Sequence, residues 1–429
     1  MHKKLWLACL MAASCVGIWG QDKPFYLKNG DRVVFYGDSI TDQRRYTQIV
    51  ETYVVTRFPN LDVTFVNSGW GGDRVDGGAG GPIDLRLKRD VIAYKPTVLT
   101  IMLGMNDGGY KAATVASDET FFAGYRHIVD STRSALPGLR ITAIEPSPYD
   151  EVTGPAQVTI DNGISYNQVL RGYGKWIDNY AAQSGLDFAD LNTDLVRMLE
   201  KAKQLDPEGA KKIIPDHVHP EFGGAMIMAE DLLKAWGAQS LVASVEIEAS
   251  TTAPQVKKTR GATISDLSAG QGLKWTELDN ALPLPFPEWQ ATWYGGTPVR
   301  LAIQSSDIAS ALNQELLKVT GLKRGAYSLK IDGESLGVFN DDELGNGINL
   351  SLISTPMTRQ AMKVYDLTVA HGDIHVAQWR YAGTSLSEYD FPQAQQATEI
   401  LDSLEKSVVE KQHEMAKPKP HTFELLPIS

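Results

Sequence analysis

The sequence predicts a three-layer α/β/α sandwich with a five-stranded parallel sheet, followed by a smaller strand-rich region with C-terminal helices. The first observation is that short β-branched runs alternate with helical stretches from Asp31 to about Gly237. This alternation implies a parallel sheet with helices on both faces. The second observation is a change after Ser240, where strand patterns separated by turns replace the alternation. A chain of 429 residues also exceeds one ordinary domain.

The first half carries five apolar runs and five stretches with apolar residues at helical spacing. The expected strands are Val33–Tyr36, Val63–Asn67, Val98–Leu103, Arg140–Ile144 and Phe188–Leu191. The expected helices are Tyr46–Phe58, Ile83–Tyr94, Phe121–Leu136, Ile164–Ser184 and Glu221–Trp236. Ligands bind outside the carboxyl ends of the strands in such a sheet, so chemistry is expected there.

The second half predicts an accessory region over 245–392 and a C-terminal helix and tail over 393–429, after a first domain over 24–240. Its expected elements are a linker or an irregular entry at Ala249–Thr263, strands at Val299–Ile303 and Leu316–Thr320, a hairpin over Tyr327–Phe339, a helix opening at Thr355-Pro356, and a helix over Gln393–Gln412. The hairpin is expected to turn at Asp332-Gly333, a pair typical of tight hairpins. The apolar end of the tail is expected to dock back onto the body.

The N-terminus, residues 1–20, reads as a signal peptide that ends near Gly20-Gln21. A basic start is followed by an apolar run, Leu5–Ile18, which is too short for an ordinary membrane span. Both cysteines, Cys9 and Cys15, lie inside this segment, so the mature chain would have no thiol. We therefore expect a secreted or periplasmic protein, with lipidation at Cys15 as the alternative.

The net charge of the chain limits the classes of binding partner that are expected. The 41 basic and 52 acidic residues give a net charge of −11. Nucleic acids and anionic membranes favour a basic face, so neither is expected as a partner. Neutral substrates such as sugars and simple esters are compatible with this charge.

Four short blocks follow predicted strands or precede a predicted helix, and together they contain the groups that nucleophilic catalysis needs. They are "GDS" at Gly37–Ser39, "NSGWGGDRV" at Asn67–Val75, "LGMNDGG" at Leu103–Gly109 and "PDHVHPEFGG" at Pro215–Gly224. A serine hydroxyl needs a base to take its proton and donors for the oxyanion that forms. Ser39, Asn106 and His219 are residues of these types, and Asp216 can reach one imidazole nitrogen of His219.

The four blocks in this order resemble the SGNH (GDSL-type) hydrolase family, and the match covers about Asp31 to Gly237. The resemblance implies that Ser39 is the nucleophile, His219 the base and Asp216 its orienting carboxylate. It also implies an oxyanion hole made by the Ser39 N–H, Gly72 and Asn106, with Gly71 as the fallback for Gly72. The resemblance implies no metal and no organic cofactor.

Several other residues and stretches have two interpretations. Trp70, Asp73 and Arg74 could hold a sugar, or they could be packing and a surface ion pair. The Pro- and aromatic-rich stretch Pro283–Gly296 could be a carbohydrate platform, although loop and core filler is the commoner use of such residues. His371 and His375 are four residues apart and could share a helix face as metal ligands, but no metalloprotease pattern accompanies them. His217, between the aspartate and the histidine, is expected to be a solvent or wall residue.

These observations favour a secreted serine esterase that acts on a small acyl group, with acetyl on a carbohydrate as the first expectation. A lipolytic acylhydrolase, resembling a lipase or lysophospholipase, is the alternative and would need a long apolar groove. The alternative from another class is a carbohydrate-binding protein with a decayed esterase domain, in which the second half does the work. The oligomeric state and the role of residues 245–429 stay open at this stage.

Overall fold

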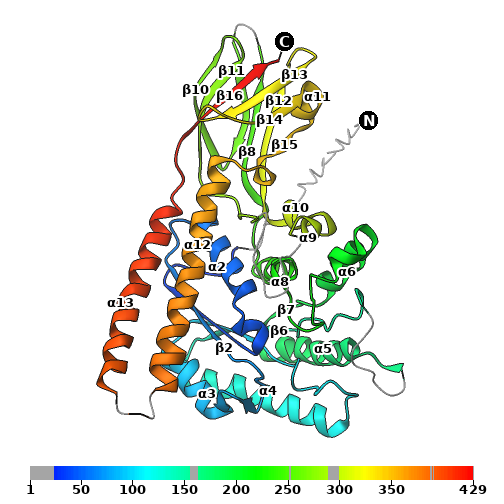
Figure 1. Ribbon diagram of the computed structural model, residues 1–429, viewed down its shortest axis with the longest axis vertical. Helices are drawn as coiled ribbons and strands as arrows, with labels where there is room; N and C mark the ends of the chain where they lie inside the picture. Colours follow the sequence, from blue (N-terminus) through cyan, green and yellow to red (C-terminus); the bar gives the residue numbers. More distant parts are fainter. Residues whose placement is uncertain are drawn as a thin grey trace, which may run out of the picture.

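The computed structural model describes residues 24–154, 163–250, 253–287, 299–386, 389 and 391–428 (Figure 1). The expected signal peptide with its two cysteines lies outside these ranges, and so does most of the aromatic stretch Pro283–Gly296. Among the helices within the described ranges, none has the length and apolar character needed to cross a bilayer.

The first half contains the predicted five-stranded parallel sheet, with strand order β2-β1-β5-β6-β7. Its strands are β1 (Asp31–Gly37), β2 (Val63–Gly69), β5 (Val98–Met102), β6 (Arg140–Ile144) and β7 (Asp187–Ala189). The register pairs Gly37 with Gly69 on one side and with Met102 on the other. The first three sequence blocks therefore meet along the carboxyl edge of the sheet.

Helices cover both faces of this sheet, with α2 and α8 on one side and α3, α4 and α5 on the other (Figure 1). The helices of this half are α1 (Ser39–Asp42), α2 (Arg45–Arg57), α3 (Ile83–Asp90), η1 (Ile92–Tyr94), α4 (Val115–Ala135), α5 (Tyr166–Ser184), α6 (Thr193–Leu205), α7 (Pro207–Ala210) and α8 (Phe222–Ala235). A small antiparallel pair, β3 (Gly77–Gly78) with β4 (Gly81–Pro82), follows the block Asn67–Val75, which is called the glycine block below. Helix α4 begins six residues before the predicted start because Thr114 and Ser117 form a capping box there.

The upper part of the molecule in Figure 1 consists of two further sheets. Their strand orders are β10-β11-β16-β13-β14 and β15-β12-β8-β9. The strands are β8 (Leu241–Glu248), β9 (Gln255–Arg260), β10 (Ala262–Ala269), β11 (Leu273–Asp279), β12 (Gln314–Thr320), β13 (Ala326–Ile331), β14 (Glu334–Asn340), β15 (Ile348–Asn349) and β16 (His421–Pro427). Short helices connect them: α9 (Val299–Ser305), α10 (Ile308–Leu312), α11 (Asp341–Asn346) and η3 (Leu350–Leu352).

Three expectations for this region are confirmed. The hairpin turns at Asp332-Gly333, where both residues have positive φ angles of 51° and 81°. The strand at Leu316–Thr320 is the main part of β12. The C-terminal tail docks back as β16, which lies between β11 and β13 and buries Phe423 and Leu425.

Two expectations are wrong. The stretch Ala249–Thr263 is not a linker, because β9 lies within it and pairs with β8, and β10 begins at Ala262. The stretch Val299–Ile303 is not a strand but the start of α9. Its apolar residues Val299, Leu301 and Ala302 are buried where α9 contacts α6 and α8, so tertiary packing overrides the β preference of valine and isoleucine.

The last helices lie mostly along the five-stranded parallel sheet, and α12 begins below the upper sheets, with Met357 and Ala361 buried in their core (Figure 1). They are α12 (Pro356–Val376), capped by Thr355 as predicted, the π-helical segment η4 (Ala377–Ser385) and α13 (Pro392–Met415). Helix α12 packs on α2, where Thr52 Oγ1 donates to Thr368 Oγ1 at 3.1 Å. Helix α12 also packs on α13.

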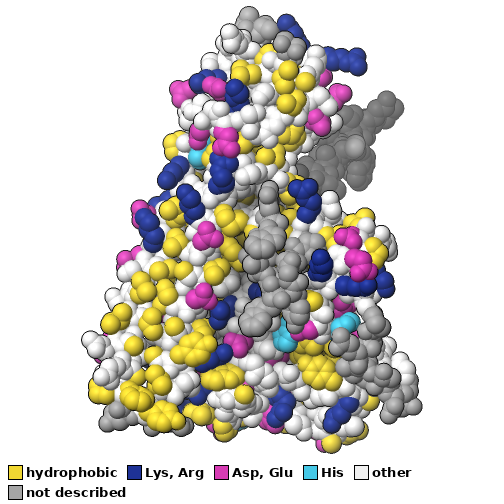
Figure 2. Space-filling view, viewed as in Figure 1, with side chains coloured by type: hydrophobic (Ala, Val, Ile, Leu, Met, Phe, Trp, Pro, Cys, Tyr) yellow, Lys and Arg dark blue, Asp and Glu magenta, His cyan; other side chains and the backbone are white. Residues whose placement is uncertain are grey.

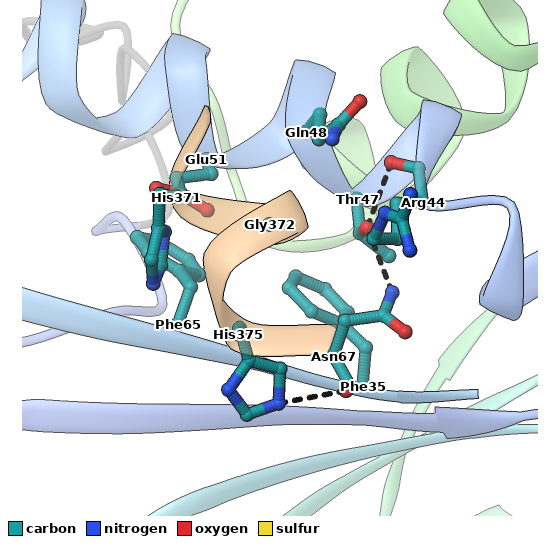
Figure 3. Close-up of a pocket in the computed structure, with 10 residues that line it drawn as sticks. All are labelled: Phe35, Arg44, Thr47, Gln48, Glu51, Phe65, Asn67, His371, Gly372 and His375. Carbon is teal, nitrogen blue, oxygen red and sulfur yellow. Dashed lines mark hydrogen bonds and ion pairs between the residues drawn. The ribbon is translucent and has the colours of Figure 1, made fainter. Parts of the chain in front are cut away.

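Figure 3 shows the contact of α12 with α2 and the sheet, around a cavity of about 20 Å³. A cavity of this size has room for about one water molecule. Both ring nitrogens of His371 face carboxylates, with Nδ1 2.8 Å from Glu51 and Nε2 3.2 Å from Glu405. Burial lowers the pKa of His371, but these two carboxylates outweigh it and raise the pKa to about 10. His371 therefore forms buried ion pairs that link α12 to α2 and to α13. His375, one turn further along α12, donates to the Asn67 carbonyl at 3.2 Å.

Apolar side chains gather over η4 and α13 on the face shown in Figure 2. The large exposed ones in this part of the chain are Tyr381, Leu386, Tyr389, Phe391, Ile400 and Leu404.

Candidate active site

Ser39 lies at the tight turn between β1 and α1. Asp38 caps α1, with its Oδ1 atom accepting the Ile40 N–H at 3.0 Å. Gly37 is required before it, because a Cβ atom there would lie 2.3 Å from Thr41 Oγ1 and 2.7 Å from the Met102 carbonyl. Asp38 is buried, and burial raises its pKa to about 7. The packing of the turn thus fixes where the Ser39 side chain begins.

Ser39, His219 and Asp216 are hydrogen-bonded in series. His219 Nε2 lies 2.8 Å from Ser39 Oγ, and His219 Nδ1 lies 2.6 Å from Asp216 Oδ2. Asp216 also accepts the backbone N–H groups of Val218 and His219 on its other oxygen. Burial raises the pKa of Asp216, but the hydrogen bonds from His219 and Val218 outweigh it and lower the pKa to about 2. Asp216 is therefore a permanent anion that orients the imidazole.

The loop that carries His219 is fixed on both sides. Arg45, at the start of α2, donates to the Pro220 carbonyl at 3.1 Å and pairs with Glu221 at 3.0 Å. His217 is buried with a φ of 68°, and its Nδ1 contacts the Asp150 carbonyl at 2.5 Å. His217 is thus a wall residue, one of the two places expected for it.

Two backbone N–H groups of the glycine block differ in their hydrogen bonding. The Gly71 N–H donates to Asp42 Oδ2 at 3.1 Å. Gly72 has a φ of 79°, and within the described ranges its N–H has no hydrogen-bond acceptor. Gly72, rather than the fallback Gly71, is the glycine with an amide available for a ligand.

Asn106 lies just past the end of β5, beside the glycine block. Its Nδ2 atom donates to the Asp73 carbonyl at 3.0 Å, which leaves the second amide hydrogen for another acceptor. The neighbouring Asp107 is buried and accepts the Val75 N–H at 2.9 Å, and burial raises its pKa to about 7. Two hydrogen bonds therefore join the loop after β5 to the loop after β2.

The three flanking residues favour the packing interpretation. The side chain of Asp73 is fully buried and pairs with Arg86, which also pairs with Asp90 and donates to the Ser68 carbonyl. The burial of this side chain favours the packing interpretation of Asp73 over contact with a sugar. Arg74 forms an exposed ion pair with Asp76.

Trp70 is held by C-terminal residues. Its ring lies 4.3 Å from the Arg380 guanidinium carbon and makes an edge contact with Trp379, with ring centroids 5.5 Å apart. Trp379 in turn donates from Nε1 to Asp90 at 2.7 Å. These contacts occupy Trp70 in packing between the two halves of the chain.

Sequence reasoning did not find Asp42, Arg45, Arg86 or Arg380. Each acts through the backbone or a neighbour, and Arg380 is 341 residues from Ser39, so no local pattern marks it. Tyr110 was also missed. Its ring contacts Tyr149 and Tyr166, and burial first, and then the charges of Asp38 and Asp216, raise its pKa to about 12. Within the described residues, no group of three or more His, Cys, Asp or Glu side chains is arranged to hold a metal ion.

The fold and the site define an α/β/α hydrolase with a serine, a histidine and an aspartate linked at the carboxyl edge of a parallel sheet. Residues 35–224 match the family of GDSL-like lipases and acylhydrolases, and this domain is a carboxylic ester hydrolase of that family.

Two relatives resemble different lengths of the chain. An acetylxylan esterase from Geobacillus stearothermophilus is 27% identical over 234 residues, which span 49% of this chain and 95% of that protein. The solved structure of a gut microbial diltiazem-metabolizing enzyme is 27% identical, with a TM-score of 0.81. That match covers 94% of this chain and 98% of the other, so the similarity includes the C-terminal region.

Proposed function

We propose that the protein is a secreted serine esterase that removes a small acyl group, acetyl first of all, from an oxygen atom of a carbohydrate. The observation that carries the serine mechanism is the hydrogen-bonded series Ser39–His219–Asp216. The substrate class is supported by the similarity to an acetylxylan esterase. The acidic net charge is compatible with a neutral sugar partner.

In the first half-reaction, Ser39 Oγ attacks the ester carbonyl carbon and His219 Nε2 takes the hydroxyl proton. The carbonyl oxygen becomes an oxyanion, which accepts hydrogen bonds from the N–H groups of Ser39 and Gly72 and from the second amide hydrogen of Asn106. Asp216, which stays ionised, stabilises the imidazolium. The intermediate collapses, the ester C–O bond breaks, and the leaving alcohol takes the proton from Nε2.

In the second half-reaction, a water molecule attacks the acyl group on Ser39 and gives its proton to His219 Nε2. The second tetrahedral intermediate uses the same oxyanion donors. Its collapse returns the proton to Ser39 Oγ and releases the carboxylic acid. Only protein groups and water take part in these steps.

The test is hydrolysis of p-nitrophenyl esters from acetate to octanoate by the chain lacking residues 1–20, beside its Ser39→Ala variant. Activity on acetate that falls steeply with acyl length and disappears in the variant supports the proposal. A preference for octanoate would favour the lipolytic alternative. A folded protein without activity on any ester would favour the alternative of a binding protein with a decayed esterase domain.

The substrate is tested by acetate release from acetylated xylo-oligosaccharides and from diltiazem, which is itself an acetate ester. Faster release from the oligosaccharides supports the carbohydrate substrate. Faster release from diltiazem, at equal concentration, would overturn the carbohydrate assignment while leaving the esterase mechanism in place. Export is tested by locating the full-length chain in fractionated cells.

A further inference from the structure

Arg380 lies on the C-terminal segment η4, yet it contacts both sides of the nucleophile turn. Its Nη1 atom lies 3.0 Å from both carboxylate oxygens of Asp42, and its Nη2 atom donates to the Gly69 carbonyl at 2.7 Å. Asp42 ends α1, the helix that begins with Ser39, and Gly69 ends β2. The Arg380 side chain is 16% exposed, so this ion pair is mostly shielded from water.

Asp42 links Arg380 to the glycine block, because its Oδ2 atom also accepts the Gly71 N–H at 3.1 Å. Gly69 also touches α1 directly, since a Cβ atom there would lie 2.2 Å from the Asp42 backbone nitrogen. A shift of either Asp42 or Gly69 would therefore move α1 and the glycine block relative to each other.

A second connection reaches the same turn from α12. His375 Nε2 donates to the Asn67 carbonyl at 3.2 Å (Figure 3). The Asn67 side chain donates to the Thr41 carbonyl at 2.8 Å, within α1. The C-terminal helices thus hold α1 through both Arg380 and His375.

We infer that Arg380 is a positioning residue that sets the glycine block for oxyanion binding, and that this is one role of the C-terminal helices. This inference rests on the proposed serine mechanism. Oxyanion donors stabilise a transition state only when they are already in place. Arg380 holds Gly69 and Asp42, so the adjoining Gly72 N–H is presented in a fixed direction. Its positive charge also offsets the Asp42 carboxylate, which would otherwise oppose the negative charge that develops nearby.

The main test is Arg380→Met, measured as kcat and KM for p-nitrophenyl acetate hydrolysis. Methionine keeps an apolar stem against Trp70 and removes the guanidinium. We expect kcat to fall about 10- to 100-fold with little change in KM, because small misplacements of reacting groups have effects of this size. Arg380→Lys should recover part of kcat, since lysine keeps the charge but cannot make both contacts at once.

The matched control is Asp373→Ala. Asp373 also links α12 to the first domain, through an ion pair with Arg44 at 3.0 Å, but it does not contact the glycine block. We expect it to keep the wild-type kcat. A fall in kcat equal to that of Arg380→Met would overturn the inference, because it would mean that general docking of α12 is what matters.

Asp42→Asn tests the same contact from the other side, and it is informative even where Arg380→Met is poorly folded. We expect it to lower kcat, and the double variant Asp42→Asn/Arg380→Met to be no worse than the more damaged single variant. A folded Arg380→Met protein with wild-type kcat, beside an inactive Ser39→Ala, would overturn this inference alone. Activity retained by Ser39→Ala would overturn the serine mechanism instead.

Discussion

The side-chain amide of Asn106 donates a hydrogen bond to the backbone carbonyl of Asp73, with the two atoms 3.0 Å apart. Asn106 follows β5 and Asp73 belongs to the loop after β2, so this bond joins two of the three proposed oxyanion donors into one unit. The Asp73 side chain is anchored in turn by buried Arg86. The direction of the remaining amide hydrogen is therefore fixed before any substrate binds.

Replacing Asn106 by alanine should lower kcat by about 10²- to 10³-fold and leave KM nearly unchanged, because the lost hydrogen bond is made to the oxyanion rather than to the ground-state carbonyl. Steady-state kinetics on p-nitrophenyl acetate measures both constants. A rise in KM with unchanged kcat would instead place Asn106 in ground-state substrate binding.

Asp216→Asn should lower kcat by about 10⁴-fold without unfolding the protein. The asparagine oxygen can still accept the N–H groups of Val218 and His219, so the loop keeps its shape. Its amide would donate to His219 Nδ1, which places the imidazole proton on Nε2, where it cannot accept the Ser39 proton. Circular dichroism checks the fold and initial rates give kcat. Near-wild-type activity would contradict the proposed role of Asp216.

The buried ion pairs of Arg86 should dominate the stability of the glycine block. Arg86→Met leaves the buried carboxylate of Asp73 without its ion-pair partner, whereas Asp90 keeps Arg89 and Trp379. Breaking a buried ion pair typically costs about 3–5 kcal/mol of unfolding free energy. Arg74→Met is the matched control, because it breaks an exposed ion pair worth at most about 1 kcal/mol. Urea denaturation compares the two variants with the wild type. Equal losses would contradict this account.

The sequence predicted those parts of the site that directly follow the strands of the parallel sheet. The carboxyl ends of parallel strands meet at one edge, so blocks separated by many residues could be placed together, as Gly37, Gly69 and Met102 are in the sheet. Long-range partners could not be predicted in this way. Arg380 reaches Asp42 through the packing of α12 on α2, and that packing has no signature in a single sequence.

The same distinction explains the errors in the second half. The hairpin at Asp332-Gly333 follows from the backbone preference of two adjacent residues, so it was predicted correctly. The stretch Val299–Ile303 has a strand composition but forms α9, because its apolar face meets α6 and α8 there. A prediction from local backbone preference is correct where residues close in sequence determine the structure. It is wrong where packing against distant elements determines it.

Three buried carboxyl groups, Glu277, Asp279 and Glu315, make the stability of the C-terminal sheets depend on pH. Burial, followed by the charges of neighbouring carboxyl groups, raises the pKa of each to about 8. These pKa values lie above those of the unfolded chain, so the folded state binds more protons. The unfolding free energy should therefore fall as the pH rises from about 4 through 8.

Glu315→Gln removes one of these groups, so the unfolding free energy of this variant should fall less steeply than that of the wild type between pH 5 and pH 9. Chemical denaturation at pH 5, 7 and 9 measures this difference. Glu334→Gln is the control, because the Glu334 side chain is 55% exposed and pairs with Arg359 at the surface, so it should keep the wild-type slope. If Glu315→Gln and the wild type have the same slope, Glu315 does not take up a proton on folding, and this account of its role is contradicted.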